Sequence, residues 1–95
     1  MSTSETIKEN IKSALNKANI PIWNVEYTPH KNFVNIDLLL DRKNSTISFI
    51  EMSIIRDLMN SNDIKAFVHK DEFKRKQKIL VSITTYKDWI EKRFS

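Results

Sequence analysis

The stretch FVNIDLLL, residues 33–40, alternates between two sets of side chains with a period of two. One set is entirely apolar and consists of Val34, Ile36, Leu38 and Leu40. The other set mixes apolar with polar side chains and consists of Phe33, Asn35, Asp37 and Leu39. Because successive side chains of a strand point to opposite faces of a sheet, this pattern predicts a strand with one fully buried face.

A second strand is predicted immediately before this one. Trp23, Val25 and Tyr27 alternate with polar residues, and the turn-forming sequence 28–32 follows. Two strands joined by so few residues are expected to form an antiparallel hairpin. In this pattern Trp23 shares a side with Val25, so we expect it to be a core anchor near the sheet edge.

The rest of the chain predicts the same unit again and one further helix. Apolar residues at helical spacing predict helices at 4–18 and 46–60, with Phe49 widening the apolar stripe of the second. Ser45 or Thr46 could cap that helix, and Ser48 with Glu51 also has capping-box spacing. Strands are predicted at 64–69 and 79–84, and a short helix at 86–94 that Thr85 could cap.

The predicted fold class is therefore α+β. A four-stranded antiparallel sheet is built from two helix–hairpin units in the order αββαββ, with a short C-terminal helix. The first two helices cover one face of the sheet, and residues 1–95 form a single domain. More than one strand order fits this sequence of elements.

Composition excludes several classes of function. The chain has no Cys and no Gly, which rules out disulfides, thiolate metal sites, P-loops and Rossmann turns. No apolar run approaches the roughly 20 residues that span a bilayer, and the polar N-terminus does not resemble a signal peptide. The expectation is a cytoplasmic protein without cofactor, metal or membrane contact.

The net charge of +4 comes from the last third of the chain, where residues 64–95 hold nine basic and four acidic side chains. The densest point is the run Lys74-Arg75-Lys76-Gln77-Lys78. Such a run attracts phosphate, although most charge runs are solvated loops. The abundance of Lys and Ile resembles the proteins of phages and other mobile elements.

The second face of the predicted sheet is the one opposite the two helices, and it includes Phe33 and Leu39. This face is more apolar than a face in contact with water needs to be. Three hypotheses explain it. The C-terminal helix could cover this face with Trp89, Ile90 and Phe94. A protein partner or a second copy could cover it. Nucleic-acid bases could stack on Phe33 and Phe67, with lysines on the phosphates.

The sequence supports a catalytic function less well than a binding function. His30 and His69 could act as an acid–base pair only if the first hairpin turn reached the third strand. Asp37 and Asp41 precede Lys43 as in some metal-dependent nucleases, but they lie about 13 Å apart on one extended stretch. We therefore expect no catalytic and no metal-binding residues.

The prediction from sequence is a small non-enzymatic protein-binding module, such as an inhibitor or accessory factor of a phage or mobile element. It would act as a homodimer or in a complex with another protein. The predicted partner-binding residues are Phe33, Phe67, Leu80 and Trp89. The alternative is an RNA or single-strand binding protein that uses Lys65, Lys74, Arg75, Lys76 and Lys78.

Overall fold

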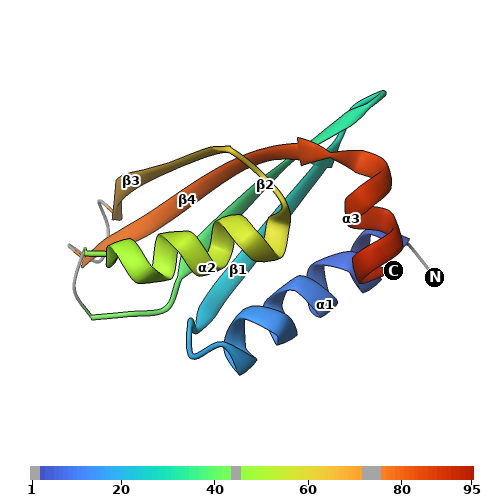
Figure 1. The fold of residues 1–95 in the computed structure, drawn as a ribbon. Coiled ribbons are helices and arrows are strands. Elements are labelled where there is room, and N and C mark those ends of the chain that lie inside the picture. Colours follow the sequence, from blue (N-terminus) through green and yellow to red (C-terminus); the bar gives the residue numbers. More distant parts are fainter. Residues whose placement is uncertain (1–2, 44–45, 72–75) are drawn as a thin grey trace.

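A computed structural model describes residues 3–43, 46–71 and 76–95, with only the backbone for 69–71 and 76–77. Its elements follow the predicted order (Figure 1). They are α1 (Thr3–Lys17), β1 (Ile22–Pro29), β2 (Phe33–Leu40), α2 (Phe49–Met59), β3 (Asp63–Asp71), β4 (Lys76–Tyr86) and α3 (Lys87–Phe94). The predicted α+β class and the two helix–hairpin units with a short final helix are confirmed.

The sheet has the strand order β1-β2-β4-β3, and every neighbouring pair is antiparallel. The two hairpins therefore meet along β2 and β4, which are far apart in sequence. At this seam Ile36 lies opposite Ile83, and Leu38 lies opposite Val81. The order that the sequence left open thus places the two most apolar strands at the centre.

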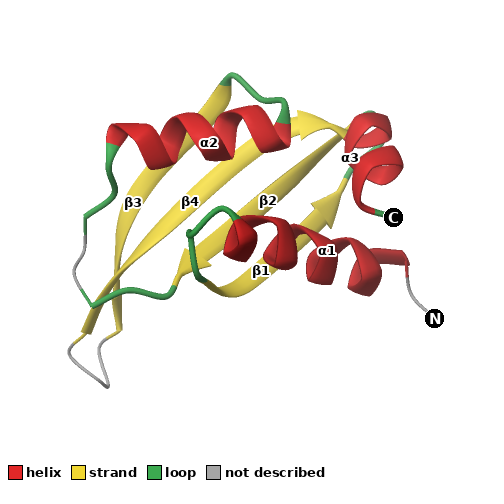
Figure 2. Cartoon of the chain, turned by 60° about the horizontal axis from the view of Figure 1, so that its bottom comes forward, coloured by secondary structure: helices red, strands yellow, loops and turns green. Residues whose placement is uncertain are grey.

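All three helices lie on one side of the sheet (Figures 1 and 2). The predicted inward set of β2 is completely buried there, as are Val81 and Ile83 of β4. The helices contribute Ile7, Ile11, Leu15, Ile55, Met59, Ile90 and Phe94 to the same core. Among the described residues, no helix combines the length and hydropathy required to cross a bilayer.

The end of α1 is set by local polar bonds. Asn19 has a left-handed backbone, with φ of 63°. This conformation lets the Ile20 N–H donate to the Leu15 carbonyl at 2.9 Å. Asn16 then accepts from the Ile22 N–H at 3.1 Å. The chain therefore reverses directly from α1 into β1, and the apolar face of α1 lies over the sheet.

The second helix begins later than the predicted residue 46, because Ser48 is its N-cap. The Glu51 N–H donates to Ser48 Oγ at 3.1 Å, and the Ser48 N–H donates to Glu51 Oε1 at 3.0 Å. The capping-box alternative was therefore the right one. The prediction that Phe49 widens the buried stripe is wrong, since Phe49 lies in the first turn and is 82% exposed.

Arg42 holds the connection between β2 and α2 in place. Its guanidinium donates to both carboxylate oxygens of Glu51, at 3.0 and 2.5 Å, and to the Thr46 carbonyl at 2.8 Å. These charge-assisted bonds, with those from Ser48, lower the pKa of the Glu51 carboxyl from about 4.5 to about 2. Arg42 and Ser48 therefore both favour the ionised form of Glu51.

The C-terminal helix does not cover the second face of the sheet, so that hypothesis is wrong. α3 follows β4 without a connecting loop, and its Ile90 and Phe94 enter the helix-side core. Asn10 of α1 donates to the Phe94 carbonyl at 2.5 Å. Thr85 does not cap α3 either, because its hydroxyl donates to the Met59 carbonyl at 2.9 Å. None of the helices that the structure describes covers the other face of the sheet.

The ion pair at the start of α2 predicts a specific pH dependence. We expect Glu51→Gln to lower the free energy of unfolding by about 1–2 kcal/mol at neutral pH. The folded-state pKa of Glu51 is depressed, so its contribution is present above about pH 4.5 and disappears as the pH falls towards 2. Urea unfolding of both proteins along this range measures the difference.

Glu9→Gln, on the exposed side of α1, is the matched control and should change stability little at any pH. If Glu51→Gln lowers the free energy of unfolding by the same amount at pH 2 and at pH 7, the assigned role of the carboxylate is contradicted.

Candidate functional site

The open face, defined as the side of the sheet without helices, carries four large apolar side chains at one end. Leu39 of β2 lies opposite Leu80 of β4, which in turn lies opposite Phe67 of β3. The Trp23 ring extends from β1 onto the same end of this face, where it lies over Lys78 of β4. We call Trp23, Leu39, Phe67 and Leu80 the apolar cluster. Trp23 and Phe67 are each half exposed, and the two leucines are partly buried.

Trp23 reaches the open face because of a bulge in β1. The register shifts between Ile22 and Asn24, so Trp23 is an extra residue in the strand. Ile22 and Val25 are both buried on the helix side, and Trp23 between them is 50% exposed on the other. The prediction that Trp23 is a core anchor is therefore wrong. An unbroken alternation would have put Trp23 on the side of Val25.

Lys78 lies beneath the Trp23 ring. The Lys78 ammonium is 2.7 Å from the centroid of the indole ring, and the residue is only 8% exposed. Because β2 separates β1 from β4, the indole spans β2 to make this cation–π contact. The contact withdraws Lys78 from solvent, so this lysine does not present its charge to a ligand on the open face.

Two acidic side chains, which we call the acidic pair, lie directly beside the apolar cluster. Glu26 of β1 is opposite Asp37 of β2, and both point to the open face. Neither forms an ion pair with a described residue, but Glu26 Oε1 accepts a hydrogen bond from Asn24 Nδ2 at 3.0 Å. Like charges at opposed positions of two strands repel each other. Together with Asn24, Leu39 and Leu80 they line a hollow of about 140 Å³.

The two predicted aromatic positions of this face are far apart. Phe33 lies six residues from Leu39 along β2, which corresponds to about 20 Å. Asn35, Ser82, Thr84 and Lys65 occupy the positions between the two ends. A polar band therefore divides the apolar positions of this face, and Phe33 does not belong to the apolar cluster.

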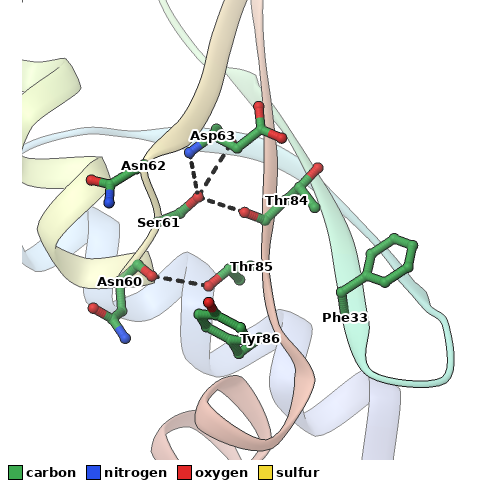
Figure 3. Close-up of a pocket in the computed structure, with 8 residues that line it drawn as sticks. All are labelled: Phe33, Asn60, Ser61, Asn62, Asp63, Thr84, Thr85 and Tyr86. Carbon is green, nitrogen blue, oxygen red and sulfur yellow. Dashed lines mark hydrogen bonds between the residues drawn. The ribbon is translucent and has the colours of Figure 1, made fainter.

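Phe33 and Tyr86 stand instead beside a wider cavity of about 400 Å³ at the opposite end of the sheet (Figure 3). Ser61 at its wall donates to the Thr84 carbonyl at 2.5 Å and accepts from the Asp63 N–H at 3.0 Å. Thr85 donates to the carbonyls of Met59 and Asn60. These hydroxyls connect the end of α2 to β4, so they serve the fold.

The first hairpin turn does not reach the backbone of His69, which lies opposite Lys78 at the other end of the sheet. The His30 ring stacks on Phe33 with ring centroids 4.4 Å apart. Its Nε2 lies 3.0 Å from Asn35 Nδ2. The hairpin turn is thereby fixed to its own strand, and the side chain of His69 lies outside the described residues. Within the described part of the chain, no three metal-ligating side chains come together.

Of the predicted partner-binding residues, Phe67 and Leu80 lie together in the apolar cluster. Trp89 lies on the helix side of the molecule, packed partly against the core. Of the basic residues, Lys65 is exposed on the open face and Lys78 is covered by Trp23. Lys74 and Arg75 lie outside the described residues, as does the side chain of Lys76.

Sequence reasoning missed four members of this surface, Trp23, Leu39, Glu26 and Asp37. Leu39 was assigned to the second face, but it was not recognised as a contact residue. Trp23 was hidden by the bulge. Asp37 was assigned to this face, but its opposition to Glu26 depends on the hairpin register. The five-residue turn was the available signal, because it limits which residues of the two strands can pair.

Comparison with models of protein families, with curated proteins and with solved structures finds no match for this chain.

The position of Trp23 predicts the stability effect of its removal. We expect Trp23→Ala to lower the free energy of unfolding by about 1–2 kcal/mol, since only half of the side chain is buried. Leu38→Ala, which empties a completely buried site on β2, should cost about 2–5 kcal/mol. Urea unfolding of both variants measures the difference. Equal losses would mean that Trp23 is part of the core.

Proposed function

We propose that the protein is a small non-enzymatic binding module that holds a protein partner on its open face, inside the cell. The observation that carries this proposal is the apolar cluster on a face that no helix covers. Isolated apolar residues are common on protein surfaces, but a contiguous group that includes a half-exposed Trp is typical of an interface.

The acidic pair suggests the chemistry of the partner. Glu26 and Asp37 lie at opposed positions of two strands, where like charges are unfavourable, and only Glu26 has a hydrogen bond, from Asn24. A cation placed between the two carboxylates would offset this repulsion. The hollow beside them has Leu39 and Leu80 on its other side. A partner segment that offers Lys or Arg next to an apolar side chain fits both parts. Such a segment would bury the apolar side chain on the leucines.

The same charges argue against nucleic acid on this face. A phosphate backbone over the centre of the sheet would approach Glu26 and Asp37. Lys78, which the nucleic-acid hypothesis needs, is covered by Trp23. Lys65 alone of the described candidates keeps an exposed position there. The observations therefore favour a protein partner over RNA or single-stranded DNA.

A pair of model peptides tests the proposal. A short peptide of alternating Lys and Leu should bind the Trp89→Phe variant and change the fluorescence of Trp23. A matched peptide of alternating Glu and Leu should bind much more weakly. Neutralising the acidic pair with Glu26→Gln and Asp37→Asn should lower the affinity for the Lys–Leu peptide about three- to tenfold. Leu80→Ala should weaken it as well.

The control is Glu9→Gln with Asp88→Asn, which removes two exposed acidic charges from the helix side and leaves the open face intact. If this control weakens binding as much as the open-face variant, the net charge decides and the proposal fails. It also fails if the protein binds single-stranded RNA with an affinity that drops about tenfold or more between 50 and 200 mM salt.

A further inference from the structure

The two edges of the sheet differ in their protection against further strand pairing. The outer edge is β1 on one side, and it contains Pro29 and the bulge at Trp23. The other edge is β3, whose nine residues pair with β4 in one unbroken register and include no Pro. Pro, bulges and charged side chains are the usual means by which edge strands avoid new partners. β3 lacks Pro and bulges, and its Lys65 points to the open face, away from the apolar row described next.

The helix side of β3 is apolar and largely uncovered. Ile64, Ala66 and Val68 point to this side, in line with the buried residues of β4. Ile64 is half-buried, but Ala66 is exposed and Val68 is 52% exposed. The helix layer therefore ends before it covers the edge strand. Three apolar side chains in a row are left along this margin.

The first turn of α2 extends this apolar margin into the helix layer. Phe49 is 82% exposed and Ile50 is 72% exposed. In Figure 2 the N-terminal end of α2 projects past β3 at this edge of the sheet. The uncovered strand and the exposed helix turn thus belong to the same side of the molecule. This side is distinct from the open face that carries the apolar cluster.

We propose that a second copy of the chain pairs with β3 through its own β3, in antiparallel orientation about a two-fold axis at Ala66. In this register Ala66 lies opposite Ala66 of the second copy, and Ile64 lies opposite Val68 of the second copy. It is the register in which all three positions of the row meet an apolar residue. Such self-complementarity is what an isologous dimer requires.

The same arrangement accounts for the exposed residues of α2. The second half of each β3 would lie beside the first half of the other, so the two α2 helices would approach each other in antiparallel orientation. Phe49 and Ile50 of one copy would then face the C-terminal half of the other α2. A single dimer contact would cover the helix turn and the strand together.

The size of this contact predicts a weak dimer. The seven paired residues, 63–69, span about 24 Å, and the sheet and helix layers together are about 20 Å thick. The buried area is therefore roughly 1,000 Å² for the two copies together, near the lower limit for a specific interface. We expect a reversible dimer with a dissociation constant of roughly 1–100 µM.

Disulfide trapping tests the register, and the chain suits it because it contains no Cys. Ala66→Cys should form a covalent dimer under mild oxidation at protein concentrations near the dissociation constant. Thr28→Cys is the matched control, because it places a thiol at an exposed position of β1 on the other edge. If Thr28→Cys cross-links as fast as Ala66→Cys, the assigned edge is wrong.

Sedimentation equilibrium of the full chain tests the interface itself. Val68→Lys, and separately Phe49→Ser with Ile50→Ser, should weaken the dimer about tenfold or more. All three positions are exposed, so circular dichroism should show an intact fold. A protein that stays monomeric up to about 1 mM would overturn the proposal. So would an association that persists unchanged in these variants.

Leu80→Ala separates this inference from the proposed function. It removes part of the apolar cluster and leaves β3 and α2 intact. It should therefore lower the affinity for the Lys–Leu peptide and leave the dissociation constant of the dimer unchanged. If Leu80→Ala abolishes the dimer and Val68→Lys does not, the two copies meet through the open face, and the β3 register is wrong.

Discussion

The antiparallel contact between β2 and β4 is the interaction on which the rest of the structure depends. These strands come from different hairpins, and their helix-side residues, such as Leu38 and Val81, are completely buried against each other. β1 can pair only with the outer side of β2, and β3 only with the outer side of β4. Burial of apolar surface at this seam therefore fixes both the strand order and the positions over which the helices pack.

A chain of this length buries one core, and here all three helices are used on the same side of it. The consequence is an open face whose composition differs along its length. The centre of this face is polar. At one end the His30 ring stacks on Phe33, and the other end carries the apolar cluster. The bulge at Trp23 contributes to that cluster, because it turns the indole ring from the buried side of β1 to the open face, where the ring lies over Lys78.

The open face and the β3 margin are two separate surfaces with different physical character. The first combines apolar side chains with two neighbouring carboxylates, Glu26 and Asp37. The second is the apolar helix side of the edge strand β3, together with the exposed first turn of α2. A protein that uses both would present two copies of the open face, one on each side of the dimer axis, and could hold two partner segments at once.

The sequence by itself determined the elements, since period-two alternation and helical spacing are local properties of the chain. The buried face of β2 and the capping box at Ser48 and Glu51 were visible in it. Only the tertiary structure decided the rest. The bulge at Trp23, the opposition of Glu26 to Asp37 and the packing of α3 beside α1 depend on strand register and on which surfaces are already covered. These are non-local quantities, because each depends on contacts between residues that lie far apart in the chain.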